Sequence, residues 1–221
     1  MLTPTCCHEA NHGSLHQILH ARTHEAQERL NKHPLLDGLT RPDYPLKSYW
    51  LLLSAYYHFY QIIEPLIERA ADRLMSRFDY TPRRKHGWLH QDLVDNFHID
   101  PDEVFWRPAR KPSPLSIENP ADLVGALYSI ENPTLDGHYI SRHIRTGLLG
   151  VTPEHGGRFF HGYGEQTSHR WNEFLNFAEQ ACPDSTQRER SAKTARDVLA
   201  EMTAALDDYS VRADSNPRPR T

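Results

Sequence analysis

The middle of the sequence contains two pairs of one glutamate and one histidine that could bind metal ions. Glu64 follows His58 by six residues, and Glu131 precedes His138 by seven. In helical proteins, Glu and His side chains that point inward from several helices can hold two iron ions. These pairs do not repeat one clean ligand motif on two helices, and a chain with 15 histidines contains such spacings by coincidence. Metal binding by these residues is therefore one alternative among several.

A second group of candidate ligands lies near the N-terminus, where His20, His24 and Gln27 share one run of helical periodicity. A helix turns about 100° per residue, so both histidines fall about 20–60° from the direction of Gln27. A neutral imidazole is a common iron ligand, whereas a carboxamide oxygen is a far weaker donor. Either histidine could therefore approach a ligand from one turn away, although solvated or hydrogen-bonded histidines are the simpler interpretation.

Length and composition indicate one ordinary domain. The chain has 221 residues, 38% of them hydrophobic, with a net charge of −4. We expect a flexible N-terminal segment over residues 1–13, one helical domain over 14–209 and a disordered tail over 210–221. Nucleic acid and anionic membranes are not expected partners, because both usually require a basic surface.

Cellular location is also constrained by the sequence. The three cysteines, at positions 6, 7 and 182, form no disulfide framework and no C-x-x-C metal motif. Residues 1–14 lack the hydrophobic segment of a signal peptide, and no apolar run approaches the roughly 18 residues needed to cross a bilayer. We therefore expect a cytoplasmic protein.

Hydrophobic periodicity predicts helices nearly throughout and no strand of useful length, so the expected fold class is all-α. The expected elements are a helix of about 17 residues between Ser14 and His33, a long helix from near Pro45 through Leu74 that bends at Pro65, and further helices over 88–97, 119–130, 134–149, 167–182 and 184–209. A Pro-rich connection covers 107–114, and an irregular aromatic segment covers 159–164.

One of these helices must be interrupted. Asn132-Pro133 follows the helix that ends near Ile130, and the proline ring clashes with the carbonyl four residues before it. Helical periodicity resumes at Thr134. We therefore expect two helical segments joined by a kink.

Several of these segments together resemble the heme oxygenase family, its bacterial branch in particular. Thr23-His24-Glu25-Ala26-Gln27 is similar to the Ala-Thr-x-x-x-His element of the family's first helix, and Ser54 to Tyr60 is similar to the Leu-Tyr-His-x-Tyr element of its second. The separation agrees without a gap, since His58 follows Gln27 by 31 residues. Further similar segments, covering roughly 15–182 with the first two, are Trp88-Leu89-x-x-Asp92-Leu93, Tyr128-x-x-Glu131-x-x-Thr134-Leu135-x-Gly137 and the segment from Phe159 to Phe174.

The resemblance implies a single-domain, heme-oxygenase-like helical fold with heme between the first helix and the kinked distal helix. In the family, heme is both cofactor and substrate, and a reductase and oxygen convert it to biliverdin, carbon monoxide and iron. The family's axial histidine corresponds to Gln27, beside Thr23 of the same element. The metal ligand is thus unknown, and heme as a cofactor is possible but in doubt.

The resemblance also implies a changed distal side. Family members typically carry glycines at the kink, where a missing Cβ lets the helix approach heme closely. Of these only Gly137 plainly remains. Thr134 and Asp136 are the candidate catalytic residues, because Asp136 could organise distal water as an acid does in some members. The preferred interpretation is that the Asp136 carboxylate obstructs the pocket.

The residues that would anchor the heme propionates differ as well. Family members place basic residues on the first helix and on the last helix of the pocket. Here the corresponding residues are His20 and His24 on one side and Asn172 and Asn176 on the other. Tyr128, which resembles a propionate neighbour in the family, is present.

Three hypotheses follow for function. The preferred one is a heme-oxygenase-like protein with a remodelled pocket, in which classical conversion of heme to biliverdin is reduced or absent and a tetrapyrrole or another small molecule binds. The second is a functional heme oxygenase with a non-histidine or displaced axial ligand. The third is a non-heme diiron oxidase on the same fold, using the carboxylate and histidine pairs described above.

Overall fold

The N-terminal helix α1 (Leu15–Asn31) begins at a reciprocal cap. The Ser14 hydroxyl accepts a hydrogen bond from the backbone N–H of Gln17 at 3.3 Å, and the Gln17 side chain accepts one from the N–H of Ser14 at 2.9 Å. Leu15, Leu19 and Leu30 lie on its buried side. The cap and this apolar side account for the helix predicted here.

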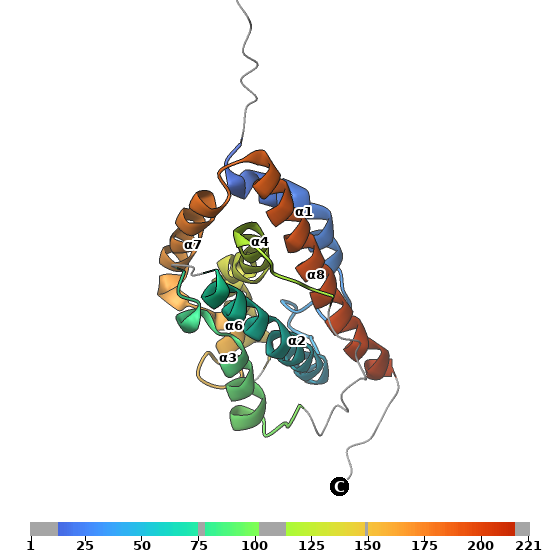
Figure 1. The fold of residues 1–221 in the computed structure, drawn as a ribbon. Coiled ribbons are helices and arrows are strands. Elements are labelled where there is room, and N and C mark those ends of the chain that lie inside the picture. The colour runs from blue at the N-terminus through green and yellow to red at the C-terminus, as the bar shows by residue number, and fades with distance from the viewer. Residues whose placement is uncertain (1–12, 75–77, 102–113, 149, 215–221) are drawn as a thin grey trace, which may run out of the picture.

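The computed structural model describes residues 13–74, 78–101, 114–148 and 150–214, and within them every regular element is helical (Figure 1). After α1 the longer elements are α2 (Leu46–Arg73), α4 (Pro120–Glu131), α5 (Gly137–Gly147), α7 (Thr167–Ala181) and α8 (Ser185–Asp214). Shorter ones are η1 (Thr81–Arg83), α3 (His86–His90), the π-helical η2 (Gln91–Asn96), η3 (Asn132–Asp136), α6 (Arg158–His161) and η4 (Gly164–Gln166). The all-α prediction is confirmed.

Helix α2 passes through the core. Residues 51–60 are all buried, and Tyr57 and His58 are each only 7% exposed, as expected for core side chains. Pro65 lies inside α2 and does not end it. Helix α8 packs along α1, α2 and α4, so the last helix joins elements from the two halves of the sequence (Figure 1).

The contact between α4 and α8 is unusually close at Gly125. A Cβ atom at Gly125 would lie 2.1 Å from the carbonyl oxygen of Ser191 and 2.9 Å from Cβ of Thr194. No side chain fits between the two backbones, so a glycine is required here. The close contact between the two backbones fixes the position of α4, and the kink follows directly after this helix.

The predicted kink is present. The Asn119 side chain caps α4 by accepting from the N–H of Asp122 at 3.0 Å, and Pro120 occupies the first turn. Helix α4 ends at Glu131, and the 3₁₀ segment η3, which contains Pro133, turns the chain into α5. The proline thus separates the two helices as its missing N–H requires.

Several predicted boundaries were wrong. The last helix extends to Asp214 rather than ending near Tyr209. The expected helix over 88–97 is divided into α3 and the π-helical η2, and the segment over 159–164 includes the single turn α6. The predicted segment 1–13, except for Gly13, and the Pro-rich connection, except for Pro114, lie outside the described residues, as do residues 215–221. Among the described helices, none is long and apolar enough to span a bilayer.

Candidate functional site

A cavity of about 160 Å³ lies between α1, α2, the kink and α6, with Met202 of α8 also in its wall. Part of its lining consists of Ile130, Ile140 and aromatic rings. A larger hollow of about 1190 Å³ lies beside α4 and α8, but it is open to solvent and lined mainly by charged and polar side chains. The smaller cavity is the better candidate site, because small-molecule sites are concave and mostly apolar with few polar groups.

Four aromatic side chains form one side of the cavity. Tyr56 and Tyr60 come from α2, and Phe159 and Phe160 come from α6. The ring of Phe159 is 5.1 Å from that of Tyr56 and 5.7 Å from that of Tyr60, centroid to centroid. Burial raises the pKa of both tyrosines above the ordinary value, so their hydroxyls stay protonated at neutral pH.

The turn that carries the two phenylalanines is held by Asp92. Its carboxylate accepts hydrogen bonds from the backbone N–H groups of Arg158 at 2.9 Å and Phe159 at 2.8 Å, which cap the start of α6. Asp92 is fully buried, and burial raises its pKa to about 6 although both hydrogen bonds act in the opposite direction. One acid of the third predicted helix therefore positions a wall of the cavity.

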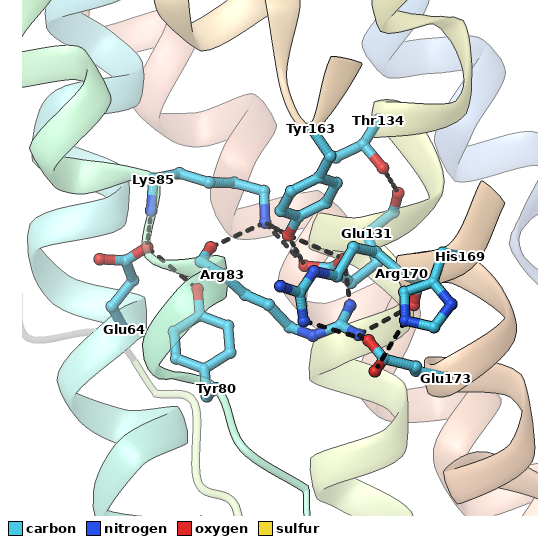
Figure 2. Close-up of polar contacts among 10 residues, drawn as sticks. All are labelled: Glu64, Tyr80, Arg83, Lys85, Glu131, Thr134, Tyr163, His169, Arg170 and Glu173. Atoms are coloured by element: carbon cyan, nitrogen blue, oxygen red, sulfur yellow. Dashed lines mark hydrogen bonds and ion pairs between the residues drawn. The ribbon is translucent and has the colours of Figure 1, made fainter. Parts of the chain in front are cut away.

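A buried ion-pair network adjoins the cavity (Figure 2). Glu131 accepts a hydrogen bond from Arg83 at 2.8 Å and one from the Lys85 ammonium at 2.7 Å, and the Tyr163 hydroxyl donates to it at 2.9 Å. Glu131 and Arg83 are 1% exposed and Lys85 is 2% exposed. Arg83 also contacts the Glu173 carboxylate at 3.0 Å, so both cations are paired with carboxylates.

Glu64 is the second buried carboxylate of this region. It accepts hydrogen bonds from the Tyr80 hydroxyl at 3.0 Å and from the backbone N–H of Lys85 (Figure 2). Burial raises the pKa of Glu64, opposed by these hydrogen bonds. The carboxylates of Glu64 and Glu131 thus already have protein donors as partners, and among the described residues no group of three or more His, Cys, Asp or Glu side chains is placed to hold a metal. This arrangement does not favour the diiron alternative.

Four of the predicted site residues line the cavity: Gln27, Thr134, Asp136 and Gly137. Gln27 is half-buried, and its amide donates to the Asn31 side chain at 3.0 Å. The Thr134 hydroxyl donates to the carbonyl oxygen of Glu131 at 2.6 Å, which ties it to the kink. Asp136 is exposed, so it lies where the cavity meets solvent.

Gly137 also has a packing role that the sequence did not predict. A Cβ atom there would lie 2.9 Å from the carbonyl oxygen of Phe160. The space left by the missing side chain is therefore needed for the contact between α5 and α6, and not only for close approach to a ligand. The glycine holds the kink against the turn that bears Phe160.

The other predicted binding residues do not line this cavity. His20 and His24 are exposed on α1. Thr23 is buried, with its hydroxyl donating to the Leu19 carbonyl at 2.8 Å. Tyr128 is buried with its ring 6.1 Å from that of Trp171; burial raises its pKa, while a hydrogen bond with Thr23 lowers it.

The expectation that Asn172 and Asn176 face the cavity was wrong. Both residues are exposed on α7 and are absent from its lining. Their side of α7 faces solvent, whereas Trp171 and Phe174 of the same helix are buried. The helical period explains the error, because a shift of one or two positions moves a side chain to another face.

Sequence reasoning missed Arg83 and Lys85 as interior residues. They stand in a basic run with Arg84, which is exposed, and Lys and Arg are rarely buried unless paired. Their partner Glu131 is 46 residues or more away in the sequence, so no local pattern predicts the pairing. The one feature of the sequence that could have suggested an interior position is that Arg83 and Lys85 lie close to the Trp88 motif in the sequence.

Comparisons with known proteins agree on one family. The heme oxygenase family profile matches residues 13–207, whereas no curated protein sequence matches. Among solved structures, the heme oxygenase from Neisseria meningitidis, determined with bound NO and CO, superposes with a TM-score of 0.71 at 15% identity, covering 94% of this chain and 98% of that one.

Two further heme oxygenase structures are similar. The protein from Leptospira interrogans has a TM-score of 0.70 at 15% identity, with 88% of this chain and 98% of that chain covered. Heme oxygenase-1 from the cyanobacterium Synechocystis, in complex with heme, has a TM-score of 0.67 at 15% identity, with coverages of 90% and 94%. The family profile spans most of the chain and the fold agrees along nearly its whole length, so this chain belongs to the heme oxygenase family.

Proposed function

We propose that this chain is a heme-oxygenase-like protein with a remodelled pocket, in which classical conversion of heme to biliverdin is reduced or absent. The pocket keeps the family's location between the first helix and the kinked helix and binds a small molecule there. The observation that carries the proposal is Gln27, which lines the cavity from α1. In our alignment with the family motif, this is the position of the axial histidine.

The residues around the cavity do not fit a heme. Sites for drug-sized ligands occupy about 300–1,000 Å³, and heme is larger than most such ligands, whereas this cavity measures about 160 Å³. The Gln27 carboxamide is a weak donor to iron and is already hydrogen-bonded to Asn31. Pro133 and Asp136 also line the cavity, at positions where the family typically has small residues.

Replacement of the ligand by a nearby histidine is not favoured either. His20 and His24 are exposed and do not line the cavity. Their rings lie 6.1 Å apart on the outer side of α1, in contact with one another and not with the pocket. A functional heme oxygenase with a displaced axial ligand would require α1 to rotate, which the packing of Leu15, Leu19 and Leu30 opposes.

A hemin titration of the wild type beside Gln27→His tests the proposal. We expect no histidine-type Soret band from the wild type, because no histidine of the described residues lines the cavity. Gln27→His should gain part of such a band, with affinity limited by the small cavity. His24→Ala is the matched control and should behave as the wild type does. A tight wild-type complex with a histidine-type spectrum that forms biliverdin with a reductase would overturn the proposal.

A further inference from the structure

Two tyrosine side chains that line the cavity have hydroxyl groups that make no hydrogen bond with the described residues. Tyr56 is 7% exposed and Tyr60 is 3% exposed, and both line the cavity. Within the part of the chain that the structure describes, neither hydroxyl is hydrogen-bonded to another protein group. Neither hydroxyl oxygen is among the buried, unpartnered polar atoms of the described residues, so both remain accessible although the side chains themselves are buried. A tyrosine hydroxyl can donate a hydrogen bond or accept one, so both are available to a polar occupant of the cavity.

The size of the cavity limits that occupant. About 160 Å³ would hold several water molecules or one small ring. An engineered apolar cavity of about 150 Å³ in another protein binds benzene. The rings of Phe159 and Tyr56 are 5.1 Å apart, and those of Phe159 and Phe160 are 5.0 Å apart, which supplies aromatic surface for ring contacts. A single aromatic ring matches both the volume and the lining.

Charge also selects the occupant. The buried cations Arg83 and Lys85 are already matched by two carboxylates: Glu131 contacts them at 2.8 and 2.7 Å, and Glu173 contacts Arg83 at 3.0 Å. A carboxylate ligand would consequently be buried without its own counter-charge, which opposes its binding. A neutral oxygen needs no counter-charge, and a tyrosine hydroxyl can donate to it or accept from it.

We propose that the cavity binds a single-ring aromatic molecule bearing one neutral oxygen, of the phenol or benzaldehyde class, with Tyr56 and Tyr60 as its hydrogen-bond partners. This inference rests on the proposed function, because it takes the remodelled pocket as a site for a molecule much smaller than heme. The ring lies against the aromatic side of the cavity, and the oxygen meets the two tyrosine hydroxyls.

The test measures binding of four probes to the full-length protein by calorimetry and ligand-detected NMR. Phenol and benzaldehyde should bind with dissociation constants below about 1 mM. Benzene, which lacks the oxygen, should bind about three- to tenfold more weakly. Benzoate should bind at least about tenfold more weakly than phenol because its charge is not compensated. Failure of phenol and benzaldehyde to bind would overturn the proposal and leave water as the occupant.

Variants of the two tyrosines test whether their hydroxyls contact the bound molecule. Tyr56→Phe combined with Tyr60→Phe should reduce phenol affinity to that of benzene and leave benzene affinity unchanged, which a merely structural change would not do. Tyr139→Phe is the control, since Tyr139 is 59% exposed and lies outside the cavity lining. Equal phenol and benzene affinities in the wild type, or unchanged phenol affinity in the double variant, would contradict the proposal. A hemin titration in parallel distinguishes this inference from the proposed function. If neither phenol binding nor hemin ligation is seen, this inference is wrong and the proposed function still stands.

Discussion

Glu131 holds two buried cations in place, and its side chain therefore matters more for stability than its size suggests. Arg83 and Lys85 contact opposite oxygens of the carboxylate at 2.8 and 2.7 Å, and the Tyr163 hydroxyl donates to both oxygens (Figure 2). The net worth of a buried ion pair is often small, because desolvation offsets the attraction. Removal of one partner is different, since the remaining charges stay buried.

Glu131→Ala should lower the free energy of unfolding by about 3–5 kcal/mol, because it leaves Arg83 and Lys85 without their shared counter-charge. Glu25→Ala is the matched control: Glu25 pairs with Arg29 at 3.1 Å, but both side chains are exposed, so the loss should be below about 0.5 kcal/mol. Urea unfolding of both variants measures the difference. Similar losses in the two variants would contradict the role given to Glu131.

The sequence predicted only some of the residues that line the cavity. Gln27, Thr134, Asp136 and Gly137 were predicted and do line the cavity. Their motifs are local, so fixed spacing within one helix or kink was enough to find them. Tyr56 and Tyr60 could not be separated from the other aromatic residues of α2, because residues 51–60 are buried on every side and only tertiary packing determines which of them border a cavity.

The two halves of the kinked helix, α4 and α5, each pack closely against a different neighbouring helix. Gly125 lets α4 contact the backbone of α8, and Gly137 lets α5 contact the Phe160 carbonyl of α6. Pro133 separates these two contacts. The cavity is small because both halves of the kinked helix are fixed against neighbours, so it cannot widen without loss of one of these contacts.

Gly125→Ala should destabilise the protein, although alanine normally favours a helix over glycine by about 1 kcal/mol. Its Cβ would overlap the Ser191 carbonyl oxygen at 2.1 Å, and the backbones of α4 and α8 would have to separate. We expect a loss of about 3 kcal/mol or more. Gly87→Ala in α3 is the control, because no atom lies within 4 Å of its added Cβ, and it should be neutral or slightly stabilising. Thermal unfolding of both variants measures the effect. A melting temperature of Gly125→Ala equal to that of the wild type would contradict the close contact between α4 and α8.

Element boundaries were predictable where caps and prolines mark them. Ser14, Asn119 with Pro120, and Pro133 all act at the predicted places. The C-terminal end of α8 was not predicted, because the apolar periodicity that marks this helix in the sequence ends at Tyr209, whereas the helix continues to Asp214. The π-helical η2 escaped prediction for another reason: it places Asp92 against the start of α6, a tertiary contact with no local signature.

For the whole molecule, Asp92 couples global stability to pH. Its pKa in the folded protein is raised from 3.8 to about 6 by burial. A raised pKa means that the folded state binds the proton more tightly than the unfolded state does. The contribution of Asp92 to stability is therefore fully present below pH 3.8 and is lost as pH rises through about 6.

The free energy of unfolding of the wild type relative to Asp92→Asn should thus fall between about pH 4 and 7, by on the order of 3 kcal/mol in total. Urea unfolding at several pH values in this interval measures the difference between the two proteins. A difference between wild type and Asp92→Asn that stays constant with pH would show that Asp92 does not titrate in this range.

The central claim is that the family fold is retained while its classical chemistry is reduced or absent. Biliverdin formation tests this most directly, with the purified protein, excess hemin, oxygen and a reductase, beside the Neisseria meningitidis heme oxygenase as a positive control. The account predicts no biliverdin from the wild type under conditions in which the control reacts to completion. Biliverdin formation at a rate comparable to that of the control would contradict it.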